Sequence, residues 1–124
     1  MSQRILEGIK VLDLTNVLSG PFTTLHLALL GAEVIKVENP RDGDLARKLG
    51  ILPELNKRLM GTSFIAQNCN KKSITLNTKS AEGKAILLRM AKDADVVVEN
   101  FRPGVMDRLG LGYKALAEIN PGLV

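Results

Sequence analysis

The side chains most suited to ligand chemistry lie in one polar turn between a predicted strand and a predicted short helix. The strand is a run of valines at 96–98, and the sequence E-N-F follows it at residues 99–101. Pro103 and Gly104 then turn the chain, and Arg108 follows within one helical turn of the glycine. Ligands of open α/β sheets bind at the carboxyl ends of strands, where turns and helix N-termini meet. The spacing therefore predicts a ligand-binding turn.

Each of these side chains also has a structural alternative, and the residues alone leave it open. Asn100 is able to cap the turn, Phe101 to pack in the core, and Arg108 to favour the dipole at a helix C-terminus. Lys71 and Lys72 likewise fit a solvated basic turn.

The first predicted β-α-β unit is a second candidate site. Gly20 and Pro21 open its helix, and Glu38 ends its second strand about 18 residues on, near the ribose-binding position of dinucleotide folds. The turn has one glycine in place of G-x-G-x-x-G, which is poor provision for a pyrophosphate. We therefore expect a generic α/β crossover with a solvated Glu38, and no NAD or FAD site.

The other reactive residue types are isolated. His26 is the only histidine, so neither a triad nor a metal site has a second one to use, and we expect it to be structural or partly exposed. For Cys69 a small buried or semi-buried side chain is favoured over a nucleophile. Asp13 lies inside a strand, which predicts an architectural role. Asp42 and Asp44 lie in a loop, and we predict no metal site.

Composition indicates one globular domain with a basic surface. Hydrophobic residues make up 45% of the 124 residues and charged residues 24%. The net charge of +4 suits a phosphate-bearing partner, but it also fits a basic surface with no polyanion partner. Aromatic residues are only 3% and no nucleic-acid-binding motif is apparent, so we expect no nucleic-acid partner.

The same sequence predicts a cytoplasmic protein with no membrane association. No apolar run approaches the ~20 residues that span a bilayer, and the start of the chain, Met1 to Arg4, lacks a signal peptide's apolar core. A single cysteine is typical of a reducing compartment.

The elements that must position these residues alternate between strand and helix. Periodicity and turn residues predict strands at 9–14, 33–37, 74–76 and 96–98, and helices at 21–30, 81–92, 105–109 and 113–119. Such β-α-β units have parallel strands and right-handed crossovers. We predict an α/β fold with an open parallel sheet.

Three segments carry more specific expectations. Residues 38–63 contain several glycines and prolines and are predicted to form a long loop with a helical turn or two, which is commonly functional. Phe22, Leu25 and Leu29 share the apolar face of the first helix. Residues 123–124 look like the opening of a further strand that is too short to pair usefully, so we expect a fragment or a truncated domain.

Several longer blocks of sequence occur in one order and spacing. They are LEGIKVLDLTNVLSGP (6–21), GAEVIKVENPRDGD (31–44) with Arg47 just beyond, NCNKKSITLN (68–77), SAEGKAILLRM (80–90) and ENFRPGVMDRLGLGY (99–113). Together they resemble the class III CoA-transferases, the CaiB/BaiF family of formyl-CoA transferase, carnitine CoA-transferase and α-methylacyl-CoA racemase. The resemblance implies that residues 1–124 are the N-terminal, Rossmann-like part of a CoA-transferase large domain.

The resemblance also implies a coenzyme A site. CoA carries a diphosphate, a 3′-phosphate and an adenine, so it needs cations and backbone donors. Leu18 stands where formyl-CoA transferase has an amide side chain, which argues against a formyl-CoA and oxalate substrate pair. The contact residues implied are Val17, Leu18, Ser19, Arg41, Asn70, Lys71, Lys72, Asn100, Phe101 and Arg108.

The family's reaction moves CoA from an acyl-CoA to a small carboxylic acid through an aspartyl intermediate, which divides one acyl transfer into easier steps. The resemblance places that aspartate beyond Val124, so no catalytic residue is assigned and residues 1–124 alone are expected to be inactive. It also implies an interlocked homodimer. The alternatives are an acyl-CoA racemase or isomerase of the same family, and a stand-alone non-catalytic CoA- or nucleotide-binding module.

Overall fold

A sheet of four parallel strands organises the chain. The computed structural model describes residues 4–124, and the strands have the spatial order β3-β2-β1-β4. They are β1 (Lys10–Asp13), β2 (Glu33–Glu38), β3 (Lys72–Thr75) and β4 (Val96–Val98). Because β2 and β3 extend the sheet on one side of β1 and β4 on the other, the strand order reverses between β1 and β4, which is where open α/β sheets bind ligands. The predicted α/β fold is confirmed.

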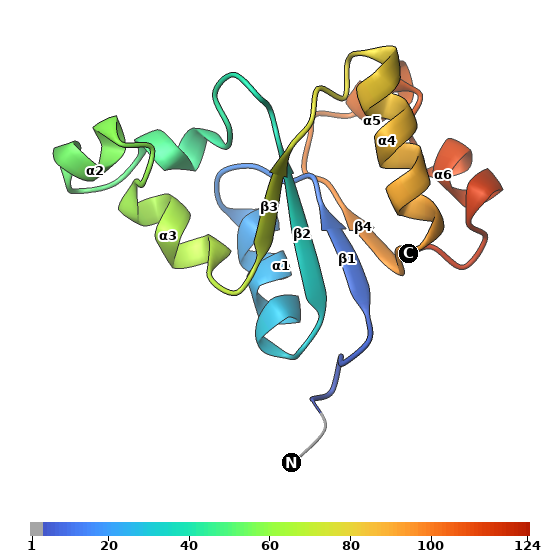
Figure 1. Cartoon of the computed structure of the whole chain (residues 1–124), viewed down its shortest axis with the longest axis horizontal. Coiled ribbons are helices and arrows are strands. Elements are labelled where there is room, and N and C mark those ends of the chain that lie inside the picture. The colour runs from blue at the N-terminus through green and yellow to red at the C-terminus, as the bar shows by residue number, and fades with distance from the viewer. Residues whose placement is uncertain (1–3) are drawn as a thin grey trace.

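Helices cover both faces of this sheet (Figure 1). They are α1 (Ser19–Leu29), α2 (Pro53–Lys57), α3 (Thr62–Asn68), α4 (Ala81–Lys92), α5 (Val105–Leu109) and α6 (Tyr113–Ile119), with a 3-10 helix η1 (Leu45–Lys48). Successive residues of β1 point to opposite faces: Val11 joins a small core with Ala28 of α1, and Leu12 joins a larger core with Leu87 of α4. Burial of both faces explains why apolar residues occupy adjacent positions of the central strands, as at Val11 and Leu12 and at Val34 and Ile35.

The segment predicted as a long loop is more helical than expected. Residues 38–63 contain η1 and α2, and α3 already begins at Thr62. No residue of α2 or α3 is fully buried. Neither helix therefore needs the periodic apolar face from which an amphipathic helix is predicted. Strand β3 likewise starts at Lys72, earlier than predicted, because an exposed edge strand shows little apolar alternation.

Helix α1 buries a different face from the one predicted. Leu25 is buried, but Phe22 and Leu29 are 53% and 58% exposed. The buried positions beside Leu25 are taken by the small residues Thr24 and Ala28, which bring the helix close to the sheet.

The C-terminal residues extend the sheet slightly. The backbone N–H of Val124 donates to the carbonyl of Asp95 at 3.0 Å, and its own carbonyl accepts from the N–H of Val97 at 2.9 Å. Pairing along β4 therefore does occur at this position, contrary to the expectation from sequence. Residues 1–3, on which the signal-peptide prediction partly depended, lie outside the described residues. No helix within residues 4–124 combines the length and apolarity needed to cross a bilayer.

Candidate functional site

A pocket of about 360 Å³ opens at the carboxyl edge of the sheet, where the sequence predicted a ligand site. The segments that follow all four strands contribute to its wall, as expected for a site at the strand-order reversal. Its lining includes Leu14 and Asn16 after β1, Asn39 and Gly43 after β2, Asn77, Thr78 and Lys79 after β3, and Phe101 and Val105 after β4.

Two asparagines connect the turns on either side of this reversal point. The backbone N–H of Asn16 donates to Oδ1 of Asn100, and Nδ2 of Asn100 donates to the carbonyl of Asn16, each at 2.9 Å. The amide of Asn100 therefore fixes the turn after β1 against the turn after β4. These bonds are the structural alternative considered for Asn100, and they position Asn16, which lines the pocket. The ligand role of Asn100 stays a prediction.

Phe101 lies on the turn after β4, and Arg108 lies in α5, which follows that turn. Phe101 lines the pocket and is 37% exposed as a residue, so it forms part of the wall and not of the core. Arg108 is exposed, and within residues 4–124 its guanidinium takes part in no ion pair. Gly104 makes room for it: the backbone there has φ +79°, and an added Cβ would lie 3.1 Å from Nη1 of Arg108. This guanidinium is free to take an anionic ligand.

The predicted contacts at the start of α1 are accessible. Val17, Leu18 and Ser19 are all exposed, and Leu18 is 61% exposed. Val17 has a φ of +70°, an uncommon conformation for a β-branched residue. They directly follow Asn16, which lines the pocket.

The predicted contacts in the NCNKKS string are engaged elsewhere. Asn70 donates to the carbonyl of Ala28 near the end of α1, and exposed Lys72 pairs with Glu33 at the start of β2. Both partners lie toward the amino edge of the sheet, so the structure does not bring these side chains to the pocket.

Lys71 is a buried structural cation in this structure. Its ammonium lies 2.9 Å from Oδ2 of Asp13 and is also within hydrogen-bond distance of Thr24, Asn68 and the carbonyl of Pro21. Four acceptors exhaust its three N–H groups. The predicted phosphate contact would therefore require Lys71 to leave these partners.

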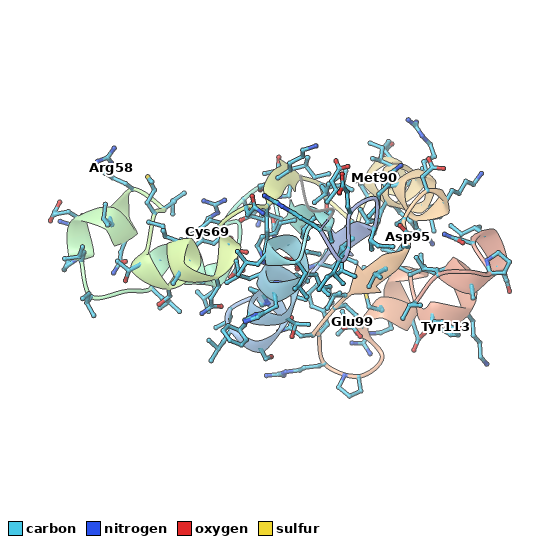
Figure 2. The ribbon with its side chains drawn as sticks, turned by 90° about the horizontal axis from the view of Figure 1, so that it is seen from below. Arg58, Cys69, Met90, Asp95, Glu99 and Tyr113 are labelled. Carbon is cyan, nitrogen blue, oxygen red and sulfur yellow. The ribbon has the colours of Figure 1, made fainter. Side chains whose placement is uncertain are left out.

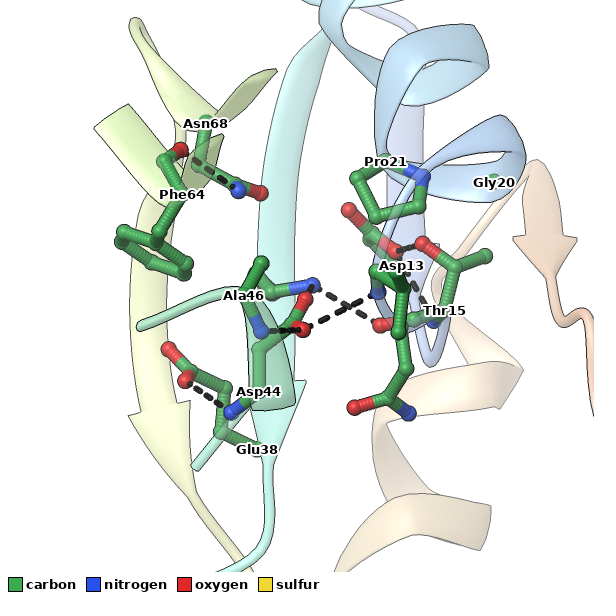
Figure 3. A network of polar contacts seen from close by, with 12 residues as sticks. Asp13, Thr15, Gly20, Pro21, Glu38, Asp44, Ala46, Phe64 and Asn68 are labelled. Atoms are coloured by element: carbon green, nitrogen blue, oxygen red, sulfur yellow. Dashed lines mark hydrogen bonds and ion pairs between the residues drawn. The ribbon is translucent and has the colours of Figure 1, made fainter. Parts of the chain in front are cut away.

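Asp13 is the centre of that cluster and is fully buried (Figure 3). It accepts hydrogen bonds from the hydroxyls of Thr15 and Thr24. Burial raises the pKa of Asp13, but the charge of Lys36 and the two hydroxyl bonds hold it below its usual range. This arrangement fits the predicted architectural role.

Glu38 is buried and paired, which corrects the expectation of a solvated side chain. Arg47 binds it through two hydrogen bonds of 2.6 and 2.7 Å, and the hydroxyl of Ser73 adds a third at 2.6 Å. Burial raises the pKa of Glu38, but the bonds from Arg47 and Ser73 outweigh it and lower that pKa to about 2. Arg41 lies on the exposed loop that follows, beside a smaller pocket of about 170 Å³.

The isolated reactive residues carry no site. His26 is exposed and its Nδ1 lies 2.8 Å from the carbonyl of Phe22. Cys69 is exposed, which corrects the expectation of burial, because it follows α3 at the surface. Asp42 pairs with Lys48 on the surface, while Asp44 is buried. Across the described residues no three metal-ligating side chains are grouped.

Sequence reasoning missed part of the pocket wall. Asn16, Asn77 and Lys79 line the pocket but were not among the predicted contacts. A usable signal existed, since all three follow predicted parallel strands, the same rule that identified the turn after β4. Lys79 adds an exposed cation to the rim.

Comparison with known proteins identifies this arrangement. The family model described as CoA-transferase family III matches residues 6–124. The chain belongs to CoA-transferase family III. It is 50% identical over 128 residues to an acyl-CoA transferase of Fusarium pseudograminearum, which covers 99% of this chain and 28% of that protein. It is also 50% identical over 125 residues to a formyl-CoA:oxalate CoA-transferase of Streptomyces coelicolor, covering 100% of this chain and 29% of that protein.

Solved family structures share the fold closely. A hypothetical protein (Rv3272) from Mycobacterium tuberculosis superposes with a TM-score of 0.87 at 43% identity, over 98% of this chain and 32% of that one. A CaiB/BaiF family protein from Brucella suis gives a TM-score of 0.86 at 38% identity, over 99% of this chain and 32% of that one. The resemblance seen in the sequence is confirmed, and the chain spans less than a third of the length of these relatives.

Proposed function

We propose that residues 1–124 form the Rossmann-like, coenzyme A-binding part of a protein that moves CoA between an acyl-CoA and a small carboxylic acid. The observation that carries this proposal is the pocket at the carboxyl edge of the sheet, with Phe101 in its wall. The unpaired Arg108 lies in α5, whose residues Val105 and Leu109 also line the pocket. Membership of CoA-transferase family III is the reason for proposing coenzyme A as the ligand of this pocket.

The chemistry of this edge suits the parts of CoA. Arg108 offers a guanidinium that can bind a phosphate through two hydrogen bonds, and Lys79 offers a second cation on the rim. Phe101 offers an exposed aromatic face for the adenine or the apolar pantetheine arm. Exposed Val17, Leu18 and Ser19 extend the same edge towards the thioester end.

For the reaction, we propose the family's aspartyl route. A carboxylate nucleophile attacks the acyl-CoA carbonyl, which forms a mixed anhydride and releases the CoA thiolate. The thiolate then attacks the enzyme-side carbonyl of the anhydride, which gives an enzyme thioester and releases the first acid. The carboxylate of the second acid displaces CoA from this thioester to form a new anhydride, and CoA attacks its acyl carbonyl, which yields the new acyl-CoA and frees the enzyme carboxylate. None of the buried carboxylates described above is available for that role. Asp13, Glu38 and Asp44 are each held by a buried or half-buried cation. The nucleophile is therefore assigned to none of these three residues.

Substrate identity and assembly stay predictions. The names of the relatives support an acyl-CoA and a carboxylic acid as partners, while Leu18 still argues against oxalate as the acid. Phe22 and Leu29 of α1 and the adjoining Leu30 are exposed, and we propose that they contribute to a subunit contact in the predicted homodimer. The racemase and the non-catalytic module are the competing functions, and both would share the CoA site. A cytoplasmic location is part of the same proposal.

Calorimetric titration of CoA into this chain tests the proposal. Wild type should bind, and Arg108→Ala should weaken binding about tenfold or more, the usual worth of a charge-assisted bond. Arg58→Ala is the matched control, because Arg58 is exposed and lies at the far end of the molecule from Glu99 (Figure 2). Binding that Arg108→Ala and Arg58→Ala leave equal, or no binding by folded wild type, would contradict the proposed site.

A further inference from the structure

One buried ion pair involves two residues that are not among the contacts predicted for the ligand. Lys36 of β2 and Asp44 of the following loop lie 2.9 Å apart, and each side chain is almost wholly buried. Neither side chain reaches solvent, so neither contacts a ligand directly. A buried pair of this kind is poor evidence for stability, because the cost of desolvation offsets its attraction.

What distinguishes the pair is the backbone it holds. Nζ of Lys36 donates to the carbonyl of Thr15 at 2.8 Å, and Oδ1 of Asp44 accepts from the N–H of Val17 at 3.0 Å. Figure 3 shows Asp44 between Ala46 and the turn that starts at Thr15. The pair therefore forms hydrogen bonds with the backbone at both ends of the turn that leads from β1 into α1.

Asn100 holds the middle of the same turn through the N–H and carbonyl of Asn16. Four consecutive backbone groups, from the Thr15 carbonyl to the Val17 N–H, are thus bonded to side chains from elsewhere in the chain. This is more than a turn of ordinary geometry needs. The turn includes Val17 at φ +70°, a conformation that persists only where its surroundings enforce it.

Asp44 also connects two walls of the pocket. Its Oδ1 accepts a second bond from the N–H of Ala46 at 2.9 Å, which fixes the loop that contains Gly43. Gly43, next to Asp44 in the chain, and Asn16, next to Val17, both line the pocket. One buried side chain thus sets the position of the loop after β2 relative to the turn after β1.

We infer that the Lys36–Asp44 pair is a positioning device, which holds the turn of residues 15–17 in the conformation that CoA meets. The inference rests on the proposed function, because the turn opens onto the pocket and continues into the exposed residues Val17–Ser19. Lys36 and Asp44 act through the backbone of this turn and make no contact with the ligand.

The test uses paired substitutions, because removing one partner alone would leave an unpaired buried charge and could unfold the chain. Lys36→Met with Asp44→Leu removes both charges and the hydrogen bonds to the Thr15 carbonyl and the Val17 N–H. Lys36→Met with Asp44→Asn also removes the charges, but its amide oxygen can still accept from the Val17 N–H. Glu54→Gln with Lys57→Met, an exposed pair on α2, is the control.

Three quantities are measured for each variant: the CoA dissociation constant by calorimetry, the free energy of unfolding in urea, and hydrogen exchange of the Val17 amide by NMR. We expect the Leu variant to weaken CoA binding about tenfold and the Asn variant about threefold. The Val17 amide should be protected in wild type and in the Asn variant and exchange quickly in the Leu variant. Affinity should fall without a matching loss of stability, which a merely structural role would not produce.

The outcomes separate this inference from the proposed function. CoA affinity equal to wild type in a folded Leu variant would overturn the inference and leave the CoA site intact. Failure of wild type to bind CoA would overturn the proposed function, and with it the ligand role of the turn. If the Leu variant does not fold, an Asn variant that exchanges Val17 as fast as a free loop overturns the inference on its own.

Discussion

Asn16 and Asn100 are bonded to each other twice, at 2.9 Å each, although 84 positions separate them in the chain. One asparagine offers its backbone and the other its side chain, so the bonds depend on the identity of Asn100 and only on the position of Asn16. They close the gap between the turns after β1 and β4, where the strand order reverses. The site is thus built from segments that meet only in the folded sheet.

Asn100→Ala should reduce the free energy of unfolding by about 1–2 kcal/mol, because two backbone groups of Asn16 lose their partners. CoA affinity should fall as well, since the pocket wall is released. Asn56→Ala provides the comparison: it removes a side-chain bond to the carbonyl of Gly50, far from the pocket. A similar loss of stability with unchanged affinity is expected there. Equal effects of both substitutions on CoA binding would argue against a special role for Asn100.

Glu38 should make stability depend on acid. Its pKa falls from 4.5 to about 2 on folding, so its contribution is complete above the unfolded value and is lost as the pH drops towards the folded one. Urea unfolding between pH 5 and pH 2 should therefore show a shallower pH dependence in Glu38→Gln than in wild type. Glu54→Gln, an exposed carboxylate on α2, should follow wild type. An unchanged slope in Glu38→Gln would show that the pairing with Arg47 contributes little.

Gly104→Ala should lower CoA affinity and destabilise the chain by about 1 kcal/mol, because alanine is strained where φ is positive. The φ is +79°, and the new methyl would also crowd Arg108. Gly8→Ala is matched in backbone strain, with φ +92°, but meets nothing within 4 Å. It should cost similar stability and leave CoA binding intact. A drop in affinity from both would trace the effect to stability alone.

Lys71→Met should destabilise the chain by about 3–5 kcal/mol, because it leaves the buried carboxylate of Asp13 unpaired. Lys72→Met should change the free energy of unfolding by less than about 1 kcal/mol, since its pair with Glu33 is exposed. Urea unfolding of the two variants measures the contrast. A stable Lys71→Met variant that no longer binds CoA would restore the ligand role expected from the sequence.

Most of the fold could be predicted because its central strands β1 and β2 are largely buried and its main helices begin and end at capping residues and glycines. Ser80 marks the start of α4 through a bond from the N–H of Gly83, and Gly110 ends α5 with a positive φ. The elements that were missed, α2 and α3, bury no residue completely and so leave no periodic signal. The start of edge strand β3 was predicted too late for the same reason, because the strand is mostly exposed.

The site was predicted less completely, and the residues show why. Phe101 and Arg108 could be placed because a strand of three valines is followed by a polar turn with Phe101 and then by the short helix that contains Arg108. Lys71 could not be distinguished from Lys72, since adjacent positions of a strand point to opposite faces and only pairing reveals which ammonium is buried. The bonds from Lys36 and Asp44 to the turn depend on register between strands, which one sequence does not reveal.

An NMR titration of ¹⁵N-labelled chain with CoA tests the central claim most directly. Backbone amide shifts should move in the turns after β1, β3 and β4 and in α5, at residues 16–19, 77–79 and 100–108, while those of α2 remain fixed. Shifts concentrated instead at residues 68–72, whose side chains Asn70 and Lys71 bond to α1, would contradict the placement of CoA at the carboxyl edge of the sheet.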